Sequence, residues 1–498
     1  MLFACKETDK PEAAAEIDVE PYRPAFHFTP VSGWMNDPNG MVYDGTQWHL
    51  FYQYYPDSTV WGPMHWGHAA STDLVHWKHL PIALYPDSLG YIFSGSAVLD
   101  SANTSGFGKD GVMPLVAIYT NHDTTGEKSG KQDFQTQSIA YSLDKGNTWT
   151  KYAGNPVLKN PGIRDFRDPK VQWYAPGKKW IMTLAVADHI AFYSSPDLKQ
   201  WTHESDFGKT AGAHGGVWEC PDLFAMECGG ETIWVLIVNI NPGGPNGGSA
   251  CQYFTGHFDG ATFKANHTET KWMDYGTDNY AGITWSNTGN RHIFLGWMSN
   301  WQYGQQVPTE KWRSAMTIPR ELSMQKVGDQ YYVASTPVKE MTVLQGDKIT
   351  MAEGSGHTID LTADTGVNPA SGRLTFTLDK AASFALEIAN ASGDTLVLGY
   401  DAAAKQYFID RSKSGLVNFE QGFGKKQVAP RLSADDMLTI DLVLDKASVE
   451  LFADGGLTTM TAIFFPRKPL TGIMLTTNDS AKVSNIRFYP IKAMKDLP

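Results

Sequence analysis

Ser71-Thr-Asp-Leu-Val-His-Trp77 is a segment that the chain repeats, and the repetition decides the fold. It returns as Ser142-Leu-Asp-Lys-Gly-Asn-Thr-Trp149 and Ser195-Pro-Asp-Leu-Lys-Gln-Trp201, with a weaker copy at His257-Phe-Asp-Gly-Ala-Thr-Phe263. The closing aromatic residues stand 72, 52 and 62 residues apart, and their average spacing of 62 divides residues 25–335 into five. Strand–turn–strand units repeated in this way are typical of radial architectures, although their usual period is about 40–50 residues. We predict a five-bladed β-propeller in which each blade carries an Asp-containing turn before an aromatic strand.

A second series of motifs keeps the same spacing. Its markers stand 57, 74, 51 and 61 residues apart and are Asp37, Ser94, Asp168, Glu219 and Tyr280. One marker therefore falls in each predicted blade, and equivalent positions on the innermost strands of a propeller converge on its axis. The spacing thus predicts that Asp37, Asp168 and Glu219 meet in one funnel.

The composition changes between residues 325 and 355. All 16 Trp lie between Trp34 and Trp312, and only His357 of the 14 His follows position 300. The C-terminal part alternates apolar and polar residues in short runs such as Arg373-Leu-Thr-Phe-Thr-Leu378, the pattern of an antiparallel β-sandwich. We predict an all-β chain divided into a tether (1–20), a propeller (21–335), a linker (336–352) and a β-sandwich (353–498).

Composition and charge exclude several classes of protein. A hydrophobic fraction of 42% and a charged fraction of 19% are those of a folded globular chain. No stretch approaches the roughly 18 unbroken apolar residues of a membrane span. The net charge of −12 argues against a nucleic-acid partner. Four Cys are too few for a disulfide scaffold in a chain of 498 residues.

The N-terminal segment Leu2-Phe3-Ala4-Cys5 resembles the end of a bacterial lipoprotein signal, where a small residue precedes the cysteine that becomes lipidated. Residues 6–20 are rich in Glu, Ala and Asp, as a flexible tether would be. We therefore predict an exported lipoprotein, acylated at Cys5 and held at the cell surface or in the periplasm, with no other membrane contact. The alternative is a cysteine without function in a disordered terminus.

Three converging carboxylates suit glycoside hydrolysis, which needs two carboxyl groups in different protonation states. Asp37 lies in the turn Asn-Asp-Pro-Asn-Gly, which is rich in hydrogen-bond donors and is expected to keep it ionised. Asp168 follows Arg167, whose cation is expected to favour its carboxylate form. Glu219 has less polar sequence neighbours, and like charges nearby favour its protonated form, as a general acid requires.

The motifs around these carboxylates resemble those of the β-fructosidases of glycoside hydrolase family 32, which include invertases, inulinases and levanases. Six segments match in order: Trp34-Met-Asn-Asp-Pro-Asn-Gly40, Phe51-Tyr-Gln53, Trp61-Gly-Pro-Met-His-Trp-Gly-His68, Phe93-Ser-Gly95, Phe166-Arg-Asp-Pro169 and Trp218-Glu-Cys-Pro-Asp222. The similarity extends from about Tyr22 over nearly the whole chain. It implies a five-bladed propeller with a β-sandwich behind it, in agreement with the count of repeats.

The resemblance also implies roles for individual residues. Asp37 would be the nucleophile, Glu219 the acid/base, and Asp168 would bind fructose hydroxyls and stabilise the transition state. Other matching positions line the fructose subsite of the family: Asn36, Gln53, Trp61, Phe93, Ser94, Arg167 and Trp301. The expected activity is release of terminal fructose from levan, inulin or their oligosaccharides, and also from sucrose, through a covalent fructosyl-enzyme intermediate.

Several alternatives stay open at this point. The chain could be an endo-acting levanase or inulinase, a fructosyltransferase, or a propeller that binds fructan without catalysis. A thiol nucleophile at Cys220 has no Cys–His arrangement in its favour. Paired histidines such as His65 and His68 suggest zinc, but residues three apart on a strand face opposite sides, so we expect no metal. The proposed chemistry needs only carboxyl groups and water, so we expect no cofactor.

Overall fold

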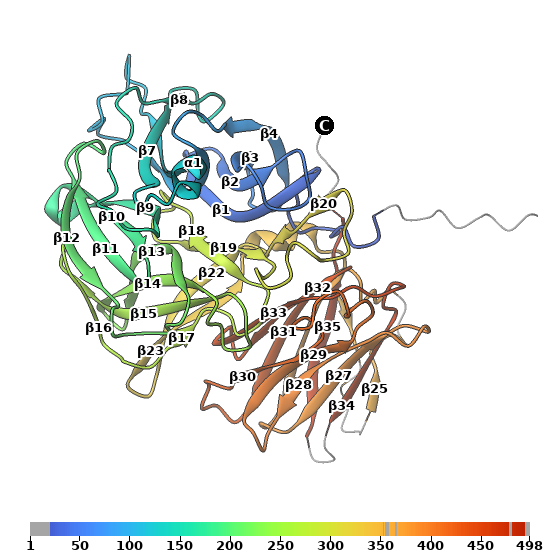
Figure 1. Ribbon diagram of the computed structural model, residues 1–498. Helices are drawn as coiled ribbons and strands as arrows, with labels where there is room; N and C mark the ends of the chain where they lie inside the picture. Colours follow the sequence, from blue (N-terminus) through green and yellow to red (C-terminus); the bar gives the residue numbers. More distant parts are fainter. Residues whose placement is uncertain (1–19, 352, 354–357, 364–365, 478–480, 494–498) are drawn as a thin grey trace, which may run out of the picture.

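The computed structural model describes residues 20–351, 353, 358–363, 366–477 and 481–493; Cys5 lies outside this part of the chain. Five sheets surround one axis, and two further sheets stack beside them (Figure 1). This arrangement confirms the predicted five-bladed propeller and C-terminal β-sandwich. Within the described residues, no helix is long and apolar enough to cross a membrane.

Each blade is built mainly from four consecutive antiparallel strands. Their bounds in the first two blades are β1 (Gly33–Tyr43), β2 (Trp48–Tyr55), β3 (His65–Ser71), β4 (Trp77–Leu84), β5 (Tyr91–Leu99), β6 (Leu115–His122), β7 (Gln135–Ser142) and β8 (Thr150–Lys151). The third and fourth blades contain β9 (Phe166–Tyr174), β10 (Lys179–Val186), β11 (His189–Ser195), β12 (Thr202–Phe207), β13 (Val217–Cys228), β14 (Glu231–Asn241), β15 (Ala250–Phe258), β16 (Phe263–Ala265) and β17 (Lys271–Trp272). The fifth blade contains β18 (Tyr280–Thr284), β19 (His292–Met298), β21 (Ala315–Met316), β22 (Arg320–Val327) and β23 (Gln330–Pro337), while β20 (Trp312–Arg313) joins the first.

The repeated Ser-x-Asp segments are the turns between the third and fourth strands of blades one to three, and the weaker copy occupies this place in blade four. In the first of them, Asp73 accepts hydrogen bonds from Ser71 Oγ and from the backbone N–H groups of Val75 and His76. An aspartate that satisfies the backbone of its own turn explains why the motif recurs with the architecture. The fifth blade uses a tighter turn, Gly328-Asp329, between β22 and β23.

Each innermost strand carries an irregularity in its pairing next to its polar motif. The register shifts between Met35 and Pro38 in β1, and between Glu219 and Asp222 in β13. Similar shifts occur in β5, in β18 and in the pairing of β9 with β10. Bulges bend a strand and redirect its side chains, so five irregular strands can turn their polar residues toward the axis. Asp168 and Cys220 have positive φ angles of 65° and 40° at these irregular positions.

The sandwich consists of two six-stranded sheets. The first contains β24 (Ile349–Thr350), β26 (Gly372–Leu378), β31 (Leu438–Asp445), β32 (Ser448–Ala453), β33 (Thr458–Ile463) and β35 (Val483–Pro490). The second contains β25 (Thr358–Asp360), β27 (Phe384–Ala389), β28 (Thr395–Asp401), β29 (Gln406–Lys413), β30 (Lys426–Pro430) and β34 (Gly472–Thr477). The stretch predicted as a linker contains the 3-10 helix Lys339–Leu344 and also β24, which pairs with β35.

Charged side chains are buried where the sandwich meets the propeller. His27 lies between two sandwich carboxylates, with Nδ1 2.7 Å from Asp445 and Nε2 2.8 Å from Glu450. Arg320 of β22 contacts Glu450 and donates to Asp274 at 2.8 Å. All five side chains are buried. A buried charge is costly unless it is paired, so His27 and Arg320 of the propeller depend on the sandwich carboxylates that they contact, and those carboxylates depend on them.

We expect this interface to lose stability at alkaline pH. Burial alone would lower the pKa of His27, but its hydrogen bonds to Asp445 and Glu450 raise it from 6.5 to about 9. Below pH 6.5 His27 is protonated in both folded and unfolded chains, and its stabilising contribution is complete. Between pH 6.5 and about 9 only the folded chain holds the proton, so a contribution of about 3 kcal/mol is lost progressively.

The measurement is the free energy of unfolding of the wild type and of His27→Gln, each at pH 6.5 and pH 9. The free energy of unfolding of the wild type should exceed that of His27→Gln by a larger margin at pH 6.5 than at pH 9. The control is His203→Gln, because that side chain is half exposed on the propeller surface. A margin over His27→Gln that is equal at both pH values would contradict the interpretation.

Candidate active site

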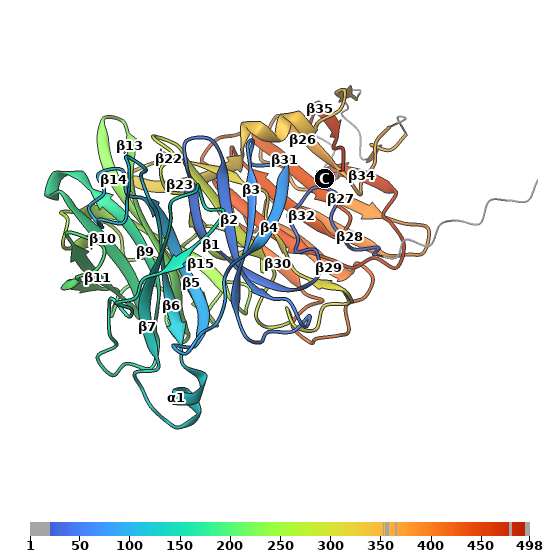
Figure 2. The ribbon, with the colours of Figure 1, turned by 90° about the horizontal axis from the view of Figure 1, so that it is seen from above.

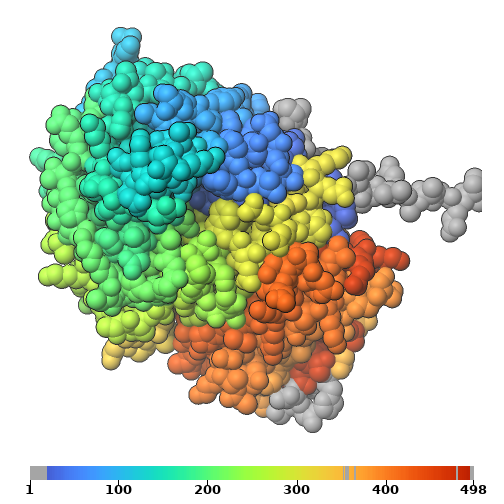
Figure 3. Space-filling view, in the orientation of Figure 1, coloured from blue at the N-terminus to red at the C-terminus, as the bar shows by residue number. Residues whose placement is uncertain are grey.

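A cavity of about 420 Å³ lies where the innermost strands meet, and all ten residues predicted for the site line it. They are Asn36, Asp37, Gln53, Trp61, Phe93, Ser94, Arg167, Asp168, Glu219 and Trp301. Five residues that the sequence analysis did not select complete the lining: His122, Glu127, Phe134, Gln135 and Asp165. Figure 3 shows the mouth as a hollow bordered by blue, cyan and yellow segments, from the first, second and fifth blades.

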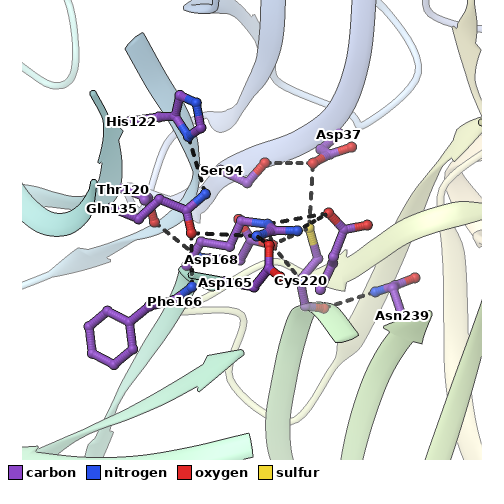
Figure 4. Close-up of polar contacts among 12 residues, drawn as sticks. Asp37, Ser94, Thr120, His122, Gln135, Asp165, Phe166, Asp168, Cys220 and Asn239 are labelled. Atoms are coloured by element: carbon purple, nitrogen blue, oxygen red, sulfur yellow. Dashed lines mark hydrogen bonds and ion pairs between the residues drawn. The ribbon is translucent and has the colours of Figure 1, made fainter. Parts of the chain in front are cut away.

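Asp37 of β1 is held by donors from three blades. Asn36 Nδ2 donates to Oδ1 at 2.9 Å, and Ser94 Oγ of β5 donates to Oδ2 at 2.6 Å. The thiol of Cys220 in β13 also lies 3.5 Å from Oδ2 (Figure 4). Asn36 is itself oriented by Trp34, whose indole N–H donates to Asn36 Oδ1 at 2.7 Å. The Asp37 carboxylate is thus fixed by groups that only the folded propeller brings together.

Asp168 of β9 shares the thiol contact with Asp37. The backbone N–H of Cys220 donates to Asp168 Oδ2 at 3.0 Å, and the Cys220 thiol lies 3.6 Å from the same oxygen. The backbone N–H of Asp168 donates to Thr120 Oγ1 at 3.0 Å. Cys220 therefore lies between the two aspartates, and burial raises the pKa of its thiol well above the ordinary value. A thiol that keeps its proton acts here as a donor, so it does not suit the role of nucleophile.

Glu219 of β13 has a different set of partners. Arg167 Nη2 lies 3.0 Å from Oε1, whereas Arg167 Nε is 3.9 Å from Asp168. Arg167 Nη1 also donates to Asp165 at 2.6 Å, and the Tyr280 hydroxyl donates to Glu219 Oε2. The charge of Arg167 lowers the pKa of Asp168, as expected, while its guanidinium donates hydrogen bonds to Glu219 and Asp165.

The pKa values of both aspartates differ from the expectation. Burial and the charge of Glu219 raise the pKa of Asp37, despite its hydrogen bonds from Ser94, Asn36 and Cys220. Burial, together with the charges of Glu219 and Asp37, raises the pKa of Asp168 to about 7 against the opposing effect of Arg167. The sequence shows donors and cations next to these residues, but the loss of water and the proximity of other carboxylates depend on the fold.

Aromatic side chains form the wall beside the first blade. The Trp61 ring lies 6.1 Å from that of Phe93, and Trp301 packs 5.0 Å from Trp297 and 5.8 Å from Trp34. The backbone N–H of Trp61 donates to Gln305 Oε1 at 3.3 Å. This bond joins the loops that carry Trp61 and Trp301.

Several residues of the site were not predicted from the sequence. Tyr280 was found as the marker of the fifth blade but was not assigned to the site, although its hydroxyl contacts Glu219. Its place in the periodic series was the signal that could have identified it. His122 is the last residue of β6 and Gln135 the first residue of β7, and neither belongs to a periodic series. Nothing in the spacing distinguishes them from ordinary loop residues.

The comparison with known protein families is consistent with this geometry. Residues 27–337 match the glycosyl hydrolases family 32 N-terminal domain, and residues 341–490 match the family 32 C-terminal domain. A levanase from Bacillus subtilis (strain 168) is 46% identical, over 95% of this chain and 71% of that protein. An extracellular exo-inulinase from Aspergillus awamori is 41% identical, over 90% of each chain.

Solved structures agree in fold. The crystal structure of the exo-inulinase from Aspergillus awamori superposes with a TM-score of 0.86 and 36% identity, covering 96% of this chain and 99% of that one. A β-fructofuranosidase from Schwanniomyces occidentalis, complexed with fructosyl-erythritol, superposes with a TM-score of 0.87 and 33% sequence identity, covering 96% of this chain and 99% of that one. Two family domains that together span most of the chain, with three carboxylates in a propeller cavity, establish that the protein is a glycosidase belonging to glycosyl hydrolase family 32.

Proposed function

We propose that the chain is a retaining β-fructosidase that releases single fructose units from the ends of β-fructans. The observation that carries the proposal is the meeting of Asp37, Asp168 and Glu219, from three blades, in one cavity lined by aromatic side chains. Relatives named levanase and exo-inulinase support fructans as the substrate class. A solved relative with bound fructosyl-erythritol supports recognition of a fructosyl unit.

In the first step, Glu219 gives its proton to the glycosidic oxygen while the bond from that oxygen to the anomeric carbon breaks. A carboxylate oxygen of Asp37 forms a bond to the same carbon, and the shortened fructan departs with the proton. In the second step, ionised Glu219 takes a proton from a water molecule whose oxygen displaces Asp37. Two displacements retain the configuration, which requires the two carboxyl groups to be about 5–5.5 Å apart.

The remaining residues support this chemistry. Arg167 and Tyr280 donate to separate oxygens of Glu219, and both stabilise the carboxylate that remains after the proton has been transferred. We assign Asp168 to the binding of fructose hydroxyls and to the stabilisation of positive charge in the transition state. Asn36, Gln53 and Ser94 complete the polar lining, and Trp61, Phe93 and Trp301 exclude water from the fructosyl unit.

The mode of attack that we propose is exo. The proposal is supported by the bulky side chains of Trp61 and Trp301 in the lining and by the hydrogen bond between their loops, which are expected to keep a polymer from extending past the terminal fructose. The test is product analysis during the first tenth of levan digestion. Fructose should appear alone while the polymer shortens slowly. A ladder of oligosaccharides would identify an endo-acting enzyme, and absence of any release would favour a binding protein without catalysis.

We also propose that the protein is exported and anchored through a lipid on Cys5. The relative from Aspergillus awamori is extracellular, which supports export, and the segment Leu2-Phe3-Ala4-Cys5 supports the anchor. Replacing Cys5 with Ala in the full-length gene product should release the enzyme from membranes into the soluble fraction. If the variant stays bound to membranes, the anchor lies elsewhere.

A further inference from the structure

One wall of the cavity comes from residues that the proposed mechanism does not use. His122 ends β6, Glu127 lies in the short helix α1 (Thr124–Lys128), Phe134 and Gln135 begin the return through β7, and Asp165 precedes β9. Figure 2 shows that α1 stands out from the propeller on the excursion between β6 and β7. We call these five residues the α1 wall. It lines the same cavity as the residues predicted to bind the fructosyl unit.

Glu127 is held in the α1 wall by two donors. Arg164 Nη2 donates to Oε1 at 2.9 Å, and His122 Nε2 lies 3.0 Å from Oε2. The direction of the second bond follows from Gln135, whose Oε1 accepts from the Phe166 backbone N–H at 2.8 Å. The Gln135 amide nitrogen therefore donates to His122 Nδ1 at 3.2 Å, which leaves the ring proton on Nε2. The neutral imidazole donates that proton to Glu127.

Ring stacking fixes this arrangement relative to the fructosyl pocket. The His122 ring lies parallel to Phe93, with centroids 4.2 Å apart and planes at 10°. Phe134 contacts the His122 ring edge-on at 5.2 Å. Because Phe93 lines the fructosyl pocket, His122 and Glu127 have a fixed position beside the first sugar. Glu127 nevertheless keeps 32% of its side chain exposed, so its carboxylate has free acceptor positions facing solvent.

The α1 wall is on the side of the cavity where the leaving group must lie. Gln135 Oε1 also accepts from Arg167 Nη1 at 3.4 Å, and Arg167 in turn contacts Glu219. An acid that protonates the glycosidic oxygen must touch that oxygen, so the sugar attached through it lies next to Glu219. Trp61 and Trp301 line the same cavity, and the Trp61 backbone is hydrogen-bonded to Gln305 in the loop that carries Trp301. The second sugar residue therefore meets the α1 wall.

We propose that Glu127 binds the hydroxyl groups of the sugar residue that follows the cleaved bond, and so selects oligosaccharide leaving groups. The inference rests on the proposed β-fructosidase function and adds the residue that recognises the leaving sugar. A carboxylate accepts hydrogen bonds from neighbouring hydroxyls, and such charge-assisted bonds are stronger than neutral ones. The hydrogen bonds from Arg164 and His122 hold the Glu127 carboxylate in this position when no substrate is present.

The experiment compares two substrates that share the fructosyl unit and differ in the leaving group. The leaving group of a fructose trisaccharide carries sugar hydroxyl groups that Glu127 can bind, whereas the leaving group of an aryl β-fructofuranoside carries none. We expect Glu127→Ala to lower kcat/KM for the trisaccharide by about tenfold, the effect of losing a hydrogen bond to a charged group. For the aryl substrate, the same variant should lower kcat/KM by no more than about twofold. Glu127→Gln, which keeps the size and one acceptor, should give a smaller but equally selective loss.

Asp133→Asn serves as the matched control, because Asp133 is an exposed acid on the same excursion and does not line the cavity. Asp133→Asn should leave kcat/KM unchanged for both substrates, and thermal unfolding should show that all variants fold. Equal losses on both substrates would mean that Glu127 acts through Glu219 or the fold, and would overturn the inference. Unchanged kcat/KM on both would overturn it too. A wild type that releases no fructose would instead refute the proposed function itself.

Discussion

Replacing Glu219 with Gln is expected to lower kcat/KM for fructans by about 10³–10⁴-fold, the contribution of a well-placed general acid. The variant keeps the shape of the side chain and its contact with Arg167, but it has no proton to give to the leaving sugar. A fructoside whose leaving group is an acidic phenol needs no protonation, so its fructosylation step should slow by less than about tenfold. Steady-state and single-turnover kinetics with the two substrates measure the difference.

A matched control for this prediction is Glu204→Gln on the propeller surface, where the carboxylate binds Lys179 far from the cavity lining. It should behave as the wild type with both substrates. If Glu219→Gln slowed fructosylation equally with the phenolic and the polymeric leaving group, Glu219 would not be the acid. The selective loss is informative because a merely structural role would affect both substrates.

Replacing Asp37 with Asn is expected to abolish activity on every fructoside, with a loss of at least about 10⁴-fold. An amide cannot form the ester to the anomeric carbon, and a better leaving group does not compensate for a missing nucleophile. The hydrogen bond from Ser94 to Oδ2 also loses its charged acceptor. Rates with fructan and with the phenolic fructoside should fall together, in contrast to Glu219→Gln.

Asp57→Asn is the control for Asp37→Asn, because Asp57 is an exposed acid on the adjoining strand end of the same blade. It should retain wild-type rates. Activity of Asp37→Asn on the phenolic fructoside within about a hundredfold of the wild type would assign the attack to another group.

The fold was predictable because its repeats depend on local chemistry. The aspartate of a Ser-x-Asp turn accepts hydrogen bonds from the backbone N–H groups of the same turn, whatever surrounds it. The segment that ends at Trp77 therefore predicts a turn from its own residues. The irregular strand segments around Asp37 and Glu219 follow the same period, which is why their convergence could be inferred. These two features depend on sequence spacing alone.

Other features depend on contacts between segments remote in the chain. The pKa of Asp168 reflects burial and two carboxylates from other blades, although its adjacent Arg167 suggested the opposite. The interface that buries His27 joins it to Asp445, 418 residues further along the chain. The α1 wall arises mainly from an excursion between two strands of the second blade. Its Gln135 matters only because the fold places it between His122 and Arg167.

The most direct test of the account is to identify the residue that carries the fructosyl group. Glu219→Gln should form the intermediate rapidly from a phenolic fructoside but hydrolyse it slowly, because no base activates the water. Quenched enzyme, digested and analysed by mass spectrometry, should then carry the mass of one fructosyl unit on the peptide that contains Asp37. A fructosyl group on any other residue, or a stoichiometric release of phenol without any adduct, would contradict the account.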